Sequence, residues 1–113
     1  MTEQDFKDIR KSIIGSAKYA WIGCSLYIRR HKRLCRSISC REYFKSKAEW
    51  FIFIEDDKWY KCDFNEIKKR IAFQTPSKKW CNAPVNNYGI IEQSYLLNHC
   101  EEIDIEDIYV NEL

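Results

Sequence analysis

Glycine, proline and long apolar runs are scarce in this chain, and each scarcity excludes a class of protein. Three glycines and two prolines among 113 residues exclude collagen-like and low-complexity architectures. A transmembrane helix requires an apolar run of about 18 residues. No run in this chain is that long, so we predict no contact with a membrane. The opening residues, MTEQDFKDIRK, are charged and lack the apolar segment of a secretory signal, so we expect a cytoplasmic location.

Sequence patterns of common catalytic and cofactor sites are also missing. The chain has no G-x-S-x-G, Walker A, G-x-G-x-x-G or C-x-x-C pattern. The spacing of His31, Cys35 and Cys40 matches no common zinc site, so we expect no metal and no cofactor. In a reducing cytosol the six cysteines are expected to be free thiols rather than three disulfides.

The composition that remains predicts one folded domain. Hydrophobic residues make up 45% of the chain and aromatic residues 15%, well above the content of disordered proteins. A chain of this length buries about two thirds of its unfolded surface, which suffices for one core. We therefore predict a single compact domain over residues 1–113.

Three segments carry helix signals. The first has a capping residue, Thr2, followed by an apolar stripe at helical spacing that ends near Gly15. The same cap signature, a serine or aspartate three residues before a glutamate, predicts short helices over 40–47 and from residue 64.

The strand signals are of unequal clarity. Residues 49–54, EWFIFI, are apolar on both faces and predict a central strand, with 59–62 returning beside it as a hairpin. Residues 19–28 and 34–39 fit two strands, but one long basic helix through both is the alternative.

Residues 75–89 hold both prolines and are expected to be irregular, and a further strand is expected over 90–97. The prediction is an α+β fold: a small, mainly antiparallel sheet packed by three or four short helices.

Charge is distributed unevenly along the chain. Residues 1–50 hold twelve Lys and Arg against five Asp and Glu, whereas residues 51–113 hold seven against twelve. The basic window, residues 28–47, carries eight Lys and Arg against one Glu. Arginine suits phosphate binding, and nearby aromatic rings can stack on unpaired bases. The predicted binding residues are Arg29, Arg30, Lys32, Arg33, Arg36 and Arg41, and the flanking rings are Tyr27, Tyr43 and Phe44.

These signals favour a small non-enzymatic interaction protein, an inhibitor or accessory factor such as phages and other mobile elements encode. Its partner is expected to be a nucleic acid or a nucleic-acid-handling protein, bound through the basic window. The sequence leaves the oligomeric state open.

Two alternatives stay open. The first is a small nuclease or RNase toxin, which requires either His31 and His99, or Asp57, Glu66 and Lys68, to meet in one cleft. The latter stretch is similar to the PD-(D/E)xK nuclease pattern but has no Pro-Asp pair.

The second alternative is an immunity-type protein that binds a basic partner through its acidic C-terminal tail. Residues 101–113 carry six acids and no base. Isoleucines alternate with these acids, which is a combination that suits protein interfaces.

Overall fold

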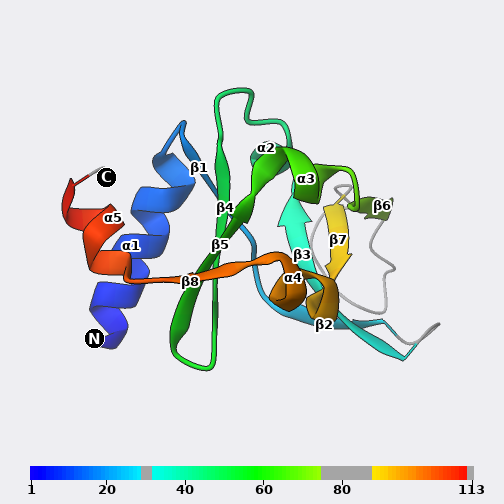
Figure 1. The fold of residues 1–113 in the computed structure, drawn as a ribbon, viewed down its shortest axis with the longest axis horizontal. Coiled ribbons are helices and arrows are strands. Elements are labelled where there is room, and N and C mark those ends of the chain that lie inside the picture. The colour runs from blue at the N-terminus through cyan, green and yellow to red at the C-terminus, as the bar shows by residue number, and fades with distance from the viewer. Residues whose placement is uncertain (29–31, 75–87, 112–113) are drawn as a thin grey trace.

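The computed structural model describes residues 1–28, 32–74 and 88–111. Within these ranges the chain forms two four-stranded sheets and five helices, as Figure 1 shows. The helices are α1 (Glu3–Gly15), α2 (Cys40–Tyr43), α3 (Phe64–Lys68), α4 (Gln93–His99) and α5 (Ile105–Asn111). The strands are β1 (Tyr19–Trp21), β2 (Ser25–Ile28), β3 (Arg33–Ser39), β4 (Trp50–Glu55), β5 (Lys58–Asp63), β6 (Ala72–Gln74), β7 (Tyr88–Glu92) and β8 (Glu101–Ile103).

The first sheet has the strand order β1-β4-β5-β8. β1 pairs with β4 in parallel, and the other pairs are antiparallel. The tight turn between β4 and β5 has Asp56 and Asp57 at φ 49° and 60°, the left-handed conformation that two-residue hairpins require. On one face of this sheet, α1 and α5 pack against Trp21, Ile52 and Trp59.

The second sheet has the order β2-β3-β7-β6 and is entirely antiparallel. Its central strand β7 carries Gly89, where a Cβ atom would lie 2.4 Å from a methyl group of Ile71. Glycine suits this position because the Ile71 side chain packs directly onto the strand, and any larger residue would force Ile71 to move.

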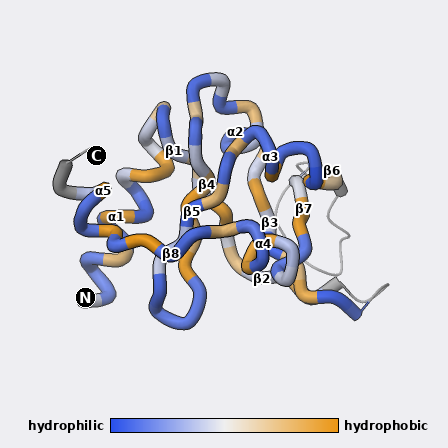
Figure 2. The backbone as a smooth tube through the Cα atoms, in the orientation of Figure 1, coloured by the Kyte–Doolittle hydropathy of each residue, from blue (hydrophilic) through white to orange (hydrophobic). Residues whose placement is uncertain are grey.

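One continuous core joins the two sheets. β1 belongs to the first sheet and β2 to the second, and only three residues connect them. Phe51 and Phe53 of the first sheet pack with Ile38 and Ile91 of the second, and α3 and α4 close the same cluster. Figure 2 shows hydrophobic colour along β7 and the β4–β5 turn, at the bottom of the view, as hydrophilic.

Most of the predicted elements are confirmed. α1 begins at a Thr2 capping box, and the β4–β5 hairpin lies inside its sheet. Ser39 and Asp63 cap α2 and α3, although each helix is only one turn long. The α+β class is correct, but the strands divide between two sheets instead of one.

The strands expected over 19–28 and 34–39 are confirmed, although the first divides into β1 and β2, so the alternative of one long basic helix is excluded. A later prediction is wrong in part. The strand expected over 90–97 ends at Glu92, and the rest of that segment forms α4. The predicted loop over 75–89 lies outside the described residues as far as position 87.

Candidate interaction surfaces

The basic window does not form one continuous surface in the described part of the chain. Arg36 is the clearest correction, because its residue is only 5% exposed. Its guanidinium donates to the carbonyl oxygens of Gly23 (3.2 Å) and Ile54 (2.7 Å) and forms an ion pair with Glu55. These bonds tie the two sheets together, so Arg36 is not available to a partner.

The remaining predicted residues lie apart. Arg29 and Arg30 are outside the described residues. Lys32 and Arg33 are exposed at the start of β3, where Arg33 pairs with Glu92. Arg41 is exposed on α2, beyond the other end of this seven-residue strand. A strand of that length spans about 23 Å, so the two basic positions flank β3 instead of sharing a patch.

The turn that carries Arg41 also contributes to a cluster of aromatic rings, which together with Arg41 and Lys68 we call the aromatic–basic face. Its rings belong to Tyr43, Phe44 and Phe73. Phe44 is 68% exposed and Phe73 43% exposed, although a folded chain generally covers such rings. The two phenyl rings lie nearly parallel at 12°, with centroids 6.2 Å apart, and the Tyr43 ring stands almost perpendicular to both.

Cations accompany these rings. The Lys68 Nζ lies 4.7 Å from the ring centroid of Tyr43 and 5.0 Å from that of Phe64, as in cation–π pairs. Arg41 is exposed on α2, and Phe44 is the residue that caps the C-terminus of the same helix. The face therefore combines exposed rings with two positive charges.

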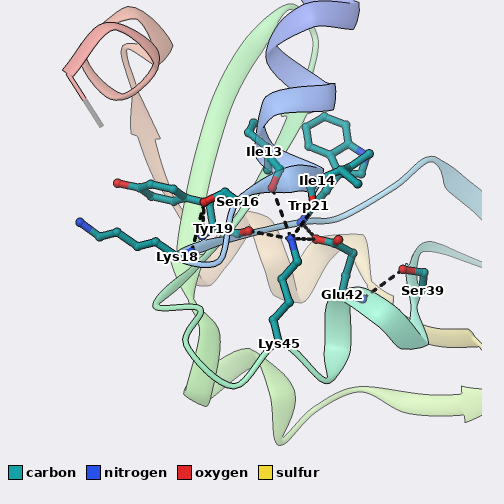
Figure 3. Close-up of polar contacts among 9 residues, drawn as sticks. All are labelled: Ile13, Ile14, Ser16, Lys18, Tyr19, Trp21, Ser39, Glu42 and Lys45. Carbon is teal, nitrogen blue, oxygen red and sulfur yellow. Dashed lines mark hydrogen bonds and ion pairs between the residues drawn. The ribbon is translucent and has the colours of Figure 1, made fainter. Parts of the chain in front are cut away.

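A buried ion pair fixes the turn that presents Phe44 (Figure 3). The Glu42 carboxylate accepts a 2.6 Å hydrogen bond from the backbone N–H of Trp21 and pairs with the Lys45 Nζ at 2.9 Å. Lys45 also donates to the carbonyl oxygens of Ile13 (3.3 Å) and Ile14 (2.9 Å), where α1 ends. Glu42 and Lys45 are thus held in the interior on either side of Phe44, whose own ring is exposed.

A hollow of the described surface lies at the other end of the molecule, where α1 begins and β8 leads into α5. We call it the acidic groove; its volume is about 1010 Å³. Half-buried or buried apolar side chains line it, namely Phe6, Ile54, Trp59, Ile103 and Ile105. Exposed carboxylates line it as well, namely Glu3, Asp57, Glu102, Asp104 and Glu106, together with the base Lys58.

The residues required for a nuclease are not brought together. Asp57 precedes β5 and Glu66 follows it, so the length of a six-residue strand, about 20 Å, separates them. Glu66 instead pairs with Lys69. The His99 ring stacks on Tyr95, and its Nδ1 lies 2.9 Å from the carbonyl oxygen of that residue. His31 lies outside the described residues.

Neither a metal cluster nor a membrane helix occurs in the described part of the chain. No group of three or more His, Cys, Asp or Glu side chains is placed to hold an ion there. None of the helices in those ranges is long and apolar enough to cross a bilayer. The cysteines described are all free of disulfides, namely Cys24, Cys35, Cys40, Cys62 and Cys100.

Comparisons with protein-family models, with curated proteins and with solved structures found no match to this chain. The function must therefore be argued from the two surfaces themselves. The sequence already indicated Phe44 and Arg41, but it missed Phe73 and Lys68, because only the fold brings β6 and α3 beside α2. For the acidic groove, the sequence indicated the isoleucines of the tail, but it missed Phe6, Ile54 and Trp59, which only the fold brings beside them.

Proposed function

We propose that the protein is a non-enzymatic factor that binds single-stranded nucleic acid through the aromatic–basic face. The observation that carries this proposal is the exposed, nearly parallel pair Phe44 and Phe73, which packs with Tyr43 and its cation Lys68. Arg41 is exposed on the same helix as Tyr43. Aromatic rings stack on nucleobases, and neighbouring cations neutralise the phosphates.

Single strands are favoured over duplexes because stacking requires unpaired bases. Bases within a duplex already stack on each other, and a side chain reaches their faces only after they separate. The face also lacks a projecting helix that would enter a major groove, since α2 is a single turn. Lys32 and Arg33, at the far end of β3, remain predicted phosphate contacts for a longer strand.

Fluorescence anisotropy with a labelled oligouridine of about 12 nucleotides tests the proposal, since sites of this class span that length. The Phe44→Ala variant is expected to weaken binding about tenfold, which corresponds to one lost base–aromatic stack. Tyr109→Ala is the matched control, because Tyr109 is an exposed aromatic residue on α5 at the opposite end of the molecule. Equal affinities for Phe44→Ala and Tyr109→Ala would contradict the proposal.

Salt dependence separates phosphate binding from apolar adhesion. Removing one phosphate contact lowers the slope of log K against log salt by about 0.7 for single strands. Arg41→Ala is expected to produce this change, whereas Arg10→Ala, which removes an exposed arginine on α1, is expected to leave the slope unaltered. A slope that is the same in both variants would remove Arg41 from the binding site.

A basic protein surface is the second candidate partner, and the acidic groove is the observation that favours it. Carboxylates around an apolar lining suit a segment that carries lysines beside an aromatic anchor. The probe is a labelled oligolysine peptide with one central tryptophan. Glu102→Gln combined with Asp104→Asn is expected to weaken its binding about tenfold.

The control for the groove is Glu66→Gln, an exposed acid on α3 that lies outside it. The peptide should bind this variant as it binds the unaltered protein. If Glu66→Gln weakens binding as much as the groove variant does, the peptide responds to net charge alone and the groove is not its site.

A further inference from the structure

The pairing of β5 with β8 brings two cysteines side by side. The register joins Tyr60 to Glu102 and Lys61 to Glu101, where β8 begins. Continued by one position, the same antiparallel register sets Cys62 opposite Cys100. Cα atoms that face each other across an antiparallel pair are about 4.5–5.5 Å apart. Disulfide-bonded cysteines have Cα separations of about 4.4–6.8 Å, so this position satisfies their geometry.

Both side chains lie on the same face of the sheet. Cys62 belongs to the core between the two sheets, and Cys100 packs against that cluster. This agrees with the register, because directly opposed residues project to one side of a sheet. Both residues are free thiols, with Cys62 Sγ 3.8 Å from the carbonyl oxygen of Phe51 and Cys100 Sγ 3.5 Å from that of Leu97.

No second cysteine pair of this kind occurs among the described residues. Cys35 stands opposite Leu26 in the β2–β3 register, and Cys24 lies one position beyond the pairing of Ser25 with Arg36. Cys40 opens α2 at the opposite end of β3 from Cys35. The β5–β8 position is therefore distinguished by geometry from the rest of the described thiols.

We propose that Cys62 and Cys100 form a modification site that a low-molecular-weight disulfide such as oxidised glutathione converts to a protein disulfide. Cys100, the more exposed of the two, loses its proton to solvent and attacks one glutathione sulfur, which releases one glutathione thiolate. Cys62 then loses its proton and attacks the Cys100 sulfur of the mixed disulfide. The second glutathione thiolate leaves, and both thiolates take up a proton. Two protein thiols are oxidised, and one glutathione disulfide is reduced to two thiols.

The surroundings of the two thiols set the rate of this exchange. Burial raises the pKa of both thiols, and for Cys62 the neighbouring Cys100 adds to the effect. Only thiolates attack disulfides, so the reaction is expected to be slow at neutral pH and to accelerate as the pH rises. The product bond ties the end of α4 and the start of β8 to the middle of the first sheet.

The test is performed on the full chain carrying Cys81→Ser, so that the thiols counted are the five described ones. The protein is incubated with excess oxidised glutathione at about pH 8.5, near the usual thiol pKa, then denatured and alkylated. Mass spectrometry is expected to show two fewer alkylated cysteines, a mass lower by two hydrogens, and a linked peptide pair containing Cys62 and Cys100. Cys24→Ser is the matched control, and this variant should still form the linkage between Cys62 and Cys100.

Any of three results overturns the proposal. The first is an alkylation count that stays unchanged after prolonged incubation. The second is glutathione that remains attached to Cys100, which would show that Cys62 does not complete the exchange, and the third is a linked peptide pair that contains other cysteines. A Cys100→Ser variant must abolish the linkage while its far-ultraviolet circular dichroism stays that of the unaltered protein.

Discussion

The aromatic–basic face and the acidic groove lie at opposite ends of the molecule and are built in opposite ways. On the face, α2, α3 and β6 bring exposed rings together beside cations. In the groove, the first and last helices meet the β4–β5 hairpin, and exposed carboxylates accompany a half-buried apolar lining. A net charge of +2 conceals the uneven distribution of charge along the sequence, where residues 1–50 are basic and residues 51–113 are acidic.

These two surfaces show that a charged segment in the sequence need not become a charged surface. The basic window loses Arg36 to the interior, where its hydrogen bonds hold the sheets together. The described part of the acidic tail, up to Asp107, keeps its carboxylates exposed, while β8 and α5 turn their isoleucines inward. The positive end of the molecule consequently depends on few residues and on the turn that presents them.

The largest expected effect on stability comes from breaking the buried ion pair between Glu42 and Lys45, which supports the turn that carries Phe44. Lys45→Met leaves the Glu42 carboxylate buried without its cation and removes the donor from the carbonyl oxygens of Ile13 and Ile14. Removing one partner of a buried ion pair costs about 3 kcal/mol or more. We expect a loss of this size in the free energy of unfolding, measured by urea titration.

Lys47→Met is the matched control, since Lys47 is exposed on the same segment. Surface changes of this kind alter stability by about 0.5 kcal/mol or less. The double variant Glu42→Gln, Lys45→Met should recover part of the loss, because the buried charge is then gone. If Lys45→Met were as stable as Lys47→Met, the ion pair would not support the turn.

The sequence was sufficient where the structure depends on neighbouring residues. The Thr2 cap, the apolar stripe of α1 and the two-faced strand at 49–54 are local patterns, and each element formed as predicted. The candidate sites depend on distant residues. Nothing in the alternation of residues 34–39 distinguishes a surface arginine from Arg36, whose partners come from β4 and the segment after β1.

The same limit explains the aromatic cluster and the division into two sheets. Phe44 and Phe73 meet only because α2 and β6 flank the same end of the second sheet. The direction change after β1 is invisible to periodicity, because residues 19–28 keep one apolar face on either side of Gly23. Short elements therefore leave the pairing of strands undetermined until the whole core is assembled.

The smallest expected effect on stability concerns the carboxylate of Asp5 at the start of α1, beside the acidic groove. Hydrogen bonds from the backbone N–H and hydroxyl of Thr2 hold the pKa of Asp5 below its ordinary value of 3.8. A carboxyl whose pKa is lower in the folded state contributes stability above its unfolded pKa, and this contribution disappears as the pH falls through the folded pKa. Asp5→Asn should therefore reduce the thermal midpoint slightly at about pH 6 and leave it unchanged at about pH 2. The control is Asp8→Asn, which removes a carboxylate one turn further along α1 and leaves the Thr2–Asp5 cap in place. A difference for Asp5→Asn that is equal at both pH values would mean that the capping carboxylate does not stabilise the start of the helix beside the groove.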